Sequence, residues 1–245
     1  RYRSSAASDV YKRQIITWLN HVAATTAEMI AHWMRVGFVH GVMNTDNMSI
    51  HGLTIDYGPY GWLENYDPNW TPNTTDSSTR RYRYGQQAQI GAWNIARLAE
   101  AVAPLMDDVQ SLYSVLEHYE NKYIEYQNAM WGQKLGIDDF VEADEALVIE
   151  LDGLLQKVET DMTIFFRMLS TIETPEIGLL ESSFYDKNTI PTDEWNAWLE
   201  KWWKRVNNKP NREAMRKANP KYVLRNWMAQ LAIDAAENED YTVCE

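Results

Sequence analysis

Polar side chains in one short stretch of the sequence have the types and the spacing to act on a phosphate. Asp46 and Asn47 end the segment His40-Gly41-Val42-Met43-Asn44-Thr45-Asp46-Asn47, and Asp56-Tyr57-Gly58 follows nine residues after Asn47. Amide and carboxylate oxygens are the hard ligands that Mg²⁺ prefers, one or two from protein and the rest from phosphate and water. Asn47 and Asp56 fit that demand, and Asp46 is the carboxylate placed to accept a proton from a nucleophile or to orient it.

The spacing of these residues agrees with a signature of phosphate-transferring enzymes. Protein kinases carry H-R-D, four residues, Asn, and later D-F-G; the first Asp handles the nucleophile, while the Asn and the second Asp hold magnesium. Counted from His40, the Asn falls on Asn47 and the second Asp on Asp56, with a glycine after it that lets the chain turn. The position of the first Asp is Val42, which cannot accept a proton. By pattern alone, a solvated loop without a metal is the alternative.

Two further groups of residues near this loop have alternative interpretations. No second His or Cys lies at ligand spacing from His40, so a role in orienting the loop is favoured over metal ligation. Arg80, Arg81 and Arg83 alternate with tyrosines and fit two roles equally. They could contact phosphate or a protein substrate, or they could neutralise nearby acids such as Asp76.

Helices and short strands must position the loop. Apolar residues at helical spacing predict a helix that begins at Ile15 and ends at Gly37. Short apolar pieces between turn-forming residues predict small strands over residues 38–62, and the composition of residues 64–85 predicts a long loop. The rest of the chain reads as helix, over about 86–103, 105–130 (broken by Gly132 and Gly136), 147–158, 162–169, 192–206 (capped by Thr192) and 219–237 (starting at Asn219-Pro220).

Composition excludes several classes of function. A net charge of −12 over 245 residues argues against a general basic surface for nucleic acid. No window reaches the roughly 18 consecutive apolar residues of a membrane span. The single cysteine, Cys244, rules out an internal disulfide. The stripe Trp195/Trp198/Trp202 lies at helical spacing and is expected to be core packing.

Several longer segments are distinctive enough to resemble one known family. HGVMNTDNMSI, GLTIDYGPYGWLENYDP, NTTDSSTRRYRYGQQ, TIFFRML and NPKYVLRNWMAQLAI resemble the selenoprotein O family, whose bacterial members are called YdiU. The resemblance covers residues 15 to about 240. It implies a protein-kinase-like fold, here a mainly α C-lobe with a few short strands around the metal and nucleotide loop. It also implies ATP binding and transfer of AMP to Ser, Thr or Tyr hydroxyls of proteins, with release of pyrophosphate.

The resemblance assigns roles to individual residues. Asp46 is the implied proton acceptor, Asn47 and Asp56 the implied ligands of Mg²⁺ (or Mn²⁺), and Asp56 also lies against the ATP. An ordinary kinase-like phosphotransferase and a non-catalytic binding or regulatory module are the alternatives. The implied partners are ATP and hydroxyl-bearing protein substrates. The implied location is mitochondrial for a eukaryotic chain and cytoplasmic for a bacterial one, in neither case secreted.

Two expectations concern the extent of the chain. Residues 1–14 are rich in Ser, Ala and Arg, lack apolar periodicity, and are expected to be a non-native leader. Residues 15–245 are expected to be the C-lobe alone, since no glycine-rich loop or Lys–Glu pair precedes His40. The family carries these in an N-terminal lobe, and its extreme C-terminal tail is also expected to be missing. The isolated piece is therefore expected to turn over ATP weakly or not at all.

Overall fold

The computed structural model describes residues 2–106 and 109–243, with side chains from residue 10 onward; Cys244 lies outside the described residues. The helices are α1 (Tyr2–Val36), α2 (Gln87–Val102), α3 (Gln110–Leu135), α4 (Glu145–Lys157), α5 (Met162–Leu169), α6 (Thr192–Arg205), α7 (Arg212–Ala218) and α8 (Asn226–Glu237). The strands are β1 (Phe38–Val39) and β2 (Gly61–Trp62), which pair antiparallel. The fold is mainly α, as the sequence predicts.

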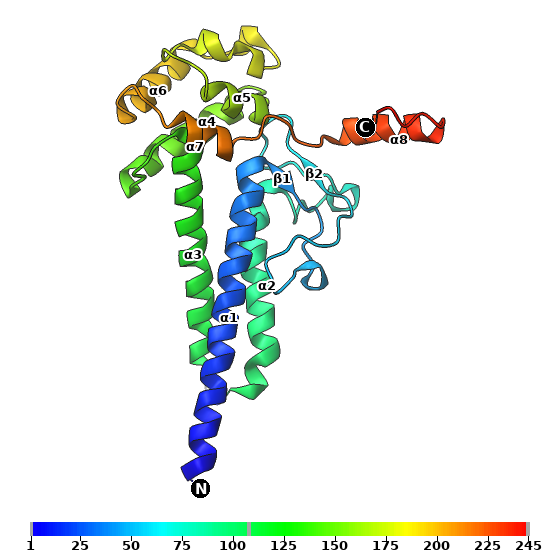
Figure 1. The fold of residues 1–245 in the computed structure, drawn as a ribbon, viewed down its shortest axis with the longest axis vertical. Coiled ribbons are helices and arrows are strands. Elements are labelled where there is room, and N and C mark those ends of the chain that lie inside the picture. Colours follow the sequence, from blue (N-terminus) through cyan, green and yellow to red (C-terminus); the bar gives the residue numbers. More distant parts are fainter. Residues whose placement is uncertain (1, 107–108, 244–245) are drawn as a thin grey trace.

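Three long helices form the shaft of the molecule. Helices α1, α2 and α3 lie side by side (Figure 1) and bury a shared apolar cluster that includes Leu19, Ala23, Ile95 and Val115. Gly37 ends α1 with a φ of 73°, a left-handed conformation that glycine adopts without strain. The chain then turns into β1 and the polar segment that follows it.

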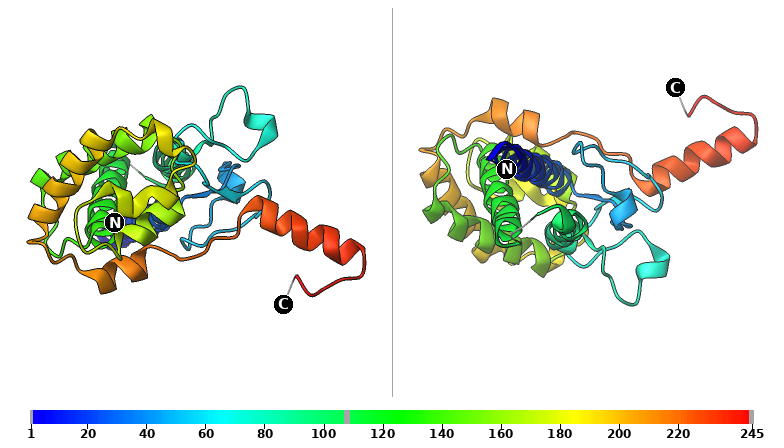
Figure 2. Two further views of the ribbon diagram at one scale, coloured as in Figure 1. Left: turned by 90° about the horizontal axis from the view of Figure 1, so that it is seen from above. Right: turned by 90° about the horizontal axis from the view of Figure 1, so that it is seen from below.

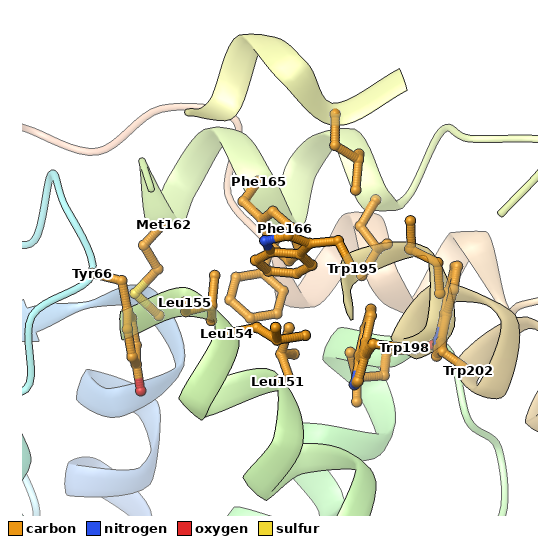
Figure 3. Close-up of a cluster of buried hydrophobic side chains, with 14 of the residues drawn as sticks. Tyr66, Leu151, Leu154, Leu155, Met162, Phe165, Phe166, Trp195, Trp198 and Trp202 are labelled. Atoms are coloured by element: carbon orange, nitrogen blue, oxygen red, sulfur yellow. The ribbon is translucent and has the colours of Figure 1, made fainter. Parts of the chain in front are cut away.

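A second layer of helices covers one end of this shaft. Helices α4, α5 and α6 enclose the largest apolar cluster, in which Trp195, Trp198 and Trp202 are fully buried, as the sequence predicts (Figure 3). Two of the three indoles have polar partners: Trp198 Nε1 donates to the Leu147 carbonyl oxygen at 2.9 Å, and Trp202 Nε1 to that of Leu135 at 2.8 Å. Most buried indole N–H groups have such acceptors, but Trp195 Nε1 has none among the described residues.

The C-terminal segment departs from the expected helix at Asn219. That residue ends α7, which the sequence analysis missed, and the last helix, α8, begins only at Asn226. The Asn219 side chain is unavailable as a helix cap, because its Oδ1 accepts from Lys134 Nζ and its Nδ2 donates to the Lys134 carbonyl oxygen. Helix α8 stands away from the body (Figure 2), tethered where the Arg225 guanidinium pairs with Asp161 at 2.6 Å.

Three helix boundaries also differ from expectation. Helix α1 begins at Tyr2 rather than Ile15, since residues 2–14 contain good helix formers and neither Gly nor Pro. Helix α3 runs through Gly132 and ends at Gly136, which alone of the two has a positive φ. Thr192 is the first residue of α6 and not its cap, its hydroxyl bonding back to the Ile190 carbonyl. None of the described helices is long and apolar enough to cross a membrane.

Candidate active site

The loop that carries the candidate residues is a hairpin closed by one short pairing. Met48 and Thr54 form an isolated antiparallel bridge, so the two arms beyond it bring Asn47 and Asp56 to the same end of the hairpin. Thr54 is fixed from behind by Trp33 of α1, whose Nε1 donates to the threonine hydroxyl at 2.9 Å. The hairpin therefore rests on the end of α1 and is attached to it.

His40 joins the two arms from inside. Its side chain is buried, and Nε2 lies 2.8 Å from the carbonyl oxygen of Ile55, the residue before Asp56. Nδ1 faces the backbone N–H of Val42 at 3.4 Å, so Nε2 carries the proton and donates, and Nδ1 accepts. The structure thus confirms the loop-orienting role expected for His40.

The same two arms touch at a glycine. Gly41 has a φ of 81°, and a Cβ built on it would meet the Pro59 carbonyl oxygen at 2.4 Å. Only glycine permits this approach. The chain bends at Gly58, as the sequence predicts, and the Gly58 N–H donates to the Asp56 carbonyl oxygen at 2.8 Å. Gly58 makes this bend without a positive φ and with open space around it. Asp56 itself has the left-handed φ, 55°, which a short polar side chain tolerates at a cost and which is enriched at functional sites.

Two buried amides of α2 hold the backbone of the loop. Gln87 Oε1 accepts from the His40 N–H at 3.0 Å, and its Nε2 donates to the Phe38 carbonyl oxygen at 2.9 Å. About two turns further along α2, Asn94 Nδ2 donates to the Met43 carbonyl oxygen at 3.0 Å. The sequence analysis missed both residues. One feature of the sequence could have revealed them. Both are amide side chains, seven residues apart, on the apolar face of a predicted helix, where a buried polar group needs a hydrogen-bond partner.

Two more amides complete the attachment. Asn73, buried in the long loop, donates through Nδ2 to the Gly41 carbonyl oxygen at 3.0 Å. Asn47 donates through Nδ2 to the Val42 carbonyl oxygen, also at 3.0 Å. This bond fixes which way the Asn47 amide points. Its acceptor, Oδ1, has no hydrogen-bond donor among the described residues and is the atom available to a cation.

The long loop is stabilised by a buried acid. Asp76 is buried, and its carboxylate accepts from the Arg81 N–H at 2.9 Å and the Tyr82 N–H at 2.8 Å. Burial favours the neutral acid, but these bonds, the Thr79 hydroxyl and, least of all, the charge of Arg81 outweigh it and lower the pKa of Asp76. Tyr82 in turn reaches the site, its hydroxyl donating to Asn44 Oδ1 at 2.6 Å.

The three candidate residues, Asp46, Asn47 and Asp56, lie on an exposed surface of the hairpin, called the shelf below. Asp46 and Asp56 are exposed and Asn47 is half-buried, and neither carboxylate has a hydrogen bond or an ion pair within residues 2–106 and 109–243. No cluster of three or more His, Cys, Asp or Glu side chains in that part of the chain could hold a metal ion alone. A free amide oxygen and a free carboxylate do suit Mg²⁺ that is also bound by nucleotide phosphates, and ligation by these two residues stays a prediction.

A cavity lies behind the shelf. It has a volume of about 310 Å³ and is enclosed by α1, α2 and the hairpin, with Thr45, Met48 and Ser49 in one wall. Asp46, Asn47 and Asp56 are not among its lining residues. The three candidate residues therefore lie outside this cavity.

Comparison with known proteins assigns the chain to a family. The family described as "Protein adenylyltransferase SelO" matches residues 2–244. "Protein nucleotidyltransferase YdiU" of Flavobacterium johnsoniae is 49% identical, over 95% of this chain and 47% of its own length. The proteins of the same name from Azoarcus sp. and Xanthomonas campestris pv. campestris are 48% and 46% identical, over 91% and 93% of this chain and 45% and 46% of their own lengths. The chain thus spans about half the length of these bacterial relatives, and it belongs to the SelO family of protein nucleotidyltransferases.

Proposed function

We propose that this chain carries the proton-accepting and metal-binding part of a protein adenylyltransferase, in a fold related to the C-lobe of protein kinases. The observation that carries the proposal is the hairpin, which presents Asp46, Asn47 and Asp56 together on an exposed shelf in a chain of the SelO family. The substrates are ATP and a protein with a free Ser, Thr or Tyr hydroxyl.

The reaction balances with one proton acceptor. The substrate hydroxyl oxygen bonds to the α-phosphorus of ATP, the bond from that phosphorus to the β-phosphate oxygen breaks, and pyrophosphate leaves. The hydroxyl proton passes to the Asp46 carboxylate, which has no competing partner among the described residues. Asn47 Oδ1 and the Asp56 carboxylate would hold Mg²⁺ (or Mn²⁺), which neutralises phosphate charge when bound.

Val42 fits this assignment. It stands where kinases have their base, and its carbonyl oxygen instead accepts from Asn47 Nδ2. Attack at the α-phosphorus rather than at the γ-phosphorus moves the nucleophile along the nucleotide, and Asp46 is the carboxylate on the same short loop. The shared spacing of His40, Asn47 and Asp56 favours phosphate transfer as the second candidate function.

Isotopic labelling separates these functions. This chain and the Flavobacterium johnsoniae relative are each incubated with protein substrates, Mg²⁺ and ATP labelled on the α- or the γ-phosphate. We expect hydroxyl-linked label from α and none from γ, with far weaker transfer by this chain alone. Label from γ would establish phosphotransfer instead, and no label in either protein would leave a non-catalytic module.

Substitutions then test the individual roles. Asp46→Asn is expected to abolish transfer while Mn²⁺ binding in the presence of ATP, read by electron paramagnetic resonance, is retained. Asp56→Asn and Asn47→Leu are expected to lose both. His51→Gln, on the exposed tip of the hairpin, is the matched control and should change neither. Transfer that survives Asp46→Asn would contradict the role of Asp46.

A further inference from the structure

The chain carries a concentrated basic surface despite its net charge of −12. Arg80 and Arg81 are exposed, Arg83 is half-buried, and all three precede α2. None of them forms an ion pair with a carboxylate among the described residues. The nearest acid in sequence, Asp76, is already satisfied by backbone N–H groups and the Thr79 hydroxyl. The Arg81 charge contributes to the lowered pKa of Asp76 but is the smallest of its causes. Arg83 Nη1 donates to the Arg80 carbonyl oxygen at 3.1 Å, so neutralisation of Asp76 does not account for all three guanidinium groups.

Aromatic rings hold part of this surface in place. The Arg81 guanidinium lies over the Trp93 ring at 4.8 Å from its centroid and over the Tyr82 ring at 5.6 Å. The Arg97 guanidinium lies over the same Trp93 ring at 5.3 Å and pairs with Glu100. A stacked guanidinium keeps its in-plane N–H groups free for an acceptor, and its orientation is fixed before that acceptor arrives.

This surface is joined directly to the candidate site. Tyr82, between Arg81 and Arg83, donates its hydroxyl proton to Asn44 Oδ1 at 2.6 Å, and Asn44 immediately precedes the short helical turn Thr45–Asn47 that contains Asp46. The segment that carries the arginines stands out from the helices next to that turn (Figure 2). A ligand bound to the arginines would therefore lie beside the proton acceptor, outside the body of the protein.

We propose that Arg80, Arg81 and Arg83, with Trp93 behind them, bind an acidic stretch of the protein substrate next to the hydroxyl that receives AMP. This inference rests on the proposed function. A guanidinium fork matches a carboxylate in bidentate geometry. The overall negative charge repels a long polyanion such as nucleic acid, whereas a short acidic peptide meets only the local arginines within a Debye length of about 10 Å.

The test measures peptide binding without ATP. A short fluorescein-labelled peptide, rich in Glu and Asp around one serine, is titrated with the protein at low ionic strength and followed by anisotropy. Arg81→Gln/Arg83→Gln is expected to weaken binding about tenfold, since two charged contacts are lost. Lys204→Gln/Lys209→Gln removes the same charge from exposed positions in the last turn of α6 and in the loop after it, and should leave binding within about twofold.

Each contrary result has a distinct meaning. Equal weakening by both double variants would show a general charge effect and overturn the proposal. So would undiminished binding by Arg81→Gln/Arg83→Gln, equal binding of the Gln/Asn version of the peptide, or equally tight binding of a single-stranded oligonucleotide. Loss of Mn²⁺–ATP binding with peptide binding retained would assign the arginines to the nucleotide instead. Because the assay needs no transfer, arginine-dependent peptide binding would stand even if AMP transfer failed.

Discussion

The side-chain oxygen of Gln87 accepts a hydrogen bond from the backbone N–H of His40 at 3.0 Å, deep inside the protein. The same amide donates to Phe38, so one side chain of α2 satisfies both a donor and an acceptor at the start of the candidate site. An amide supplies both functions without a charge. The attachment of the site loop to α2 therefore does not depend on the protonation of the attaching side chain.

Replacing this amide should be costly. Gln87→Met leaves the His40 N–H and the Phe38 carbonyl buried without partners, and each such group costs about 1–3 kcal/mol. We expect the free energy of unfolding to fall by about 2–4 kcal/mol in urea titrations. Gln89→Met, the same change at an exposed position of α2, should cost less than about 0.5 kcal/mol. Equal losses in the two variants would mean that the bonds of Gln87 are not the cause.

The two glycines near Asp56 should respond in opposite ways. Gly41→Ala forces a side chain into a left-handed conformation and against the Pro59 carbonyl, so a loss of at least about 2 kcal/mol is expected from thermal unfolding. Gly58→Ala meets nothing within 4 Å and should be neutral or slightly stabilising. A larger loss of stability in Gly58→Ala than in Gly41→Ala would contradict the close contact between Gly41 and Pro59.

Lys134 should make stability depend on pH. It is fully buried, donates to the Arg35 carbonyl and to Asn219 Oδ1, and lies 3.7 Å from the centroid of the Phe166 ring. Burial, with a smaller contribution from the Arg35 charge, holds its pKa well below the usual value of 10.5. The unfolded chain therefore binds more protons between the two pKa values, and stability rises with pH across that window.

The measurement is urea unfolding between pH 6 and pH 9, compared with Lys134→Met. The stability of the native chain relative to this variant should rise with pH by up to about 1.4 kcal/mol per unit, because at most one proton is involved. Lys157→Met, at an exposed position in α4, should leave that slope unchanged. A flat difference between the native chain and Lys134→Met would show that Lys134 is charged in the fold.

Two tryptophans offer a matched test of the core. Trp198 is fully buried and donates to the Leu147 carbonyl, whereas Trp227 on α8 is 52% exposed. Trp198→Ala should cost about 3–5 kcal/mol, because it leaves a large cavity in the core. Trp227→Ala should cost less than about 1 kcal/mol. Similar losses on chemical unfolding would contradict the packing of the tryptophan stripe.

The sequence by itself determined the helical class, the extent of α5, the burial of the tryptophan stripe and the segment that carries Asp46, Asn47 and Asp56. These follow from periodicity and from motif spacing, which are local along the chain. The sequence also indicated the family, which the match over residues 2–244 confirms.

The tertiary structure decided what holds the site together. Gln87, Asn94 and Asn73 hold the loop from elements distant in sequence, and local patterns do not reveal which buried amide meets which backbone group. The same holds for Asn219. The sequence predicts it as a helix cap, but its side chain accepts a hydrogen bond from Lys134 instead. Residue types determine which hydrogen bonds are chemically possible. The packing of α2 against the loop, which depends on contacts between residues distant in sequence, determines which of those hydrogen bonds form.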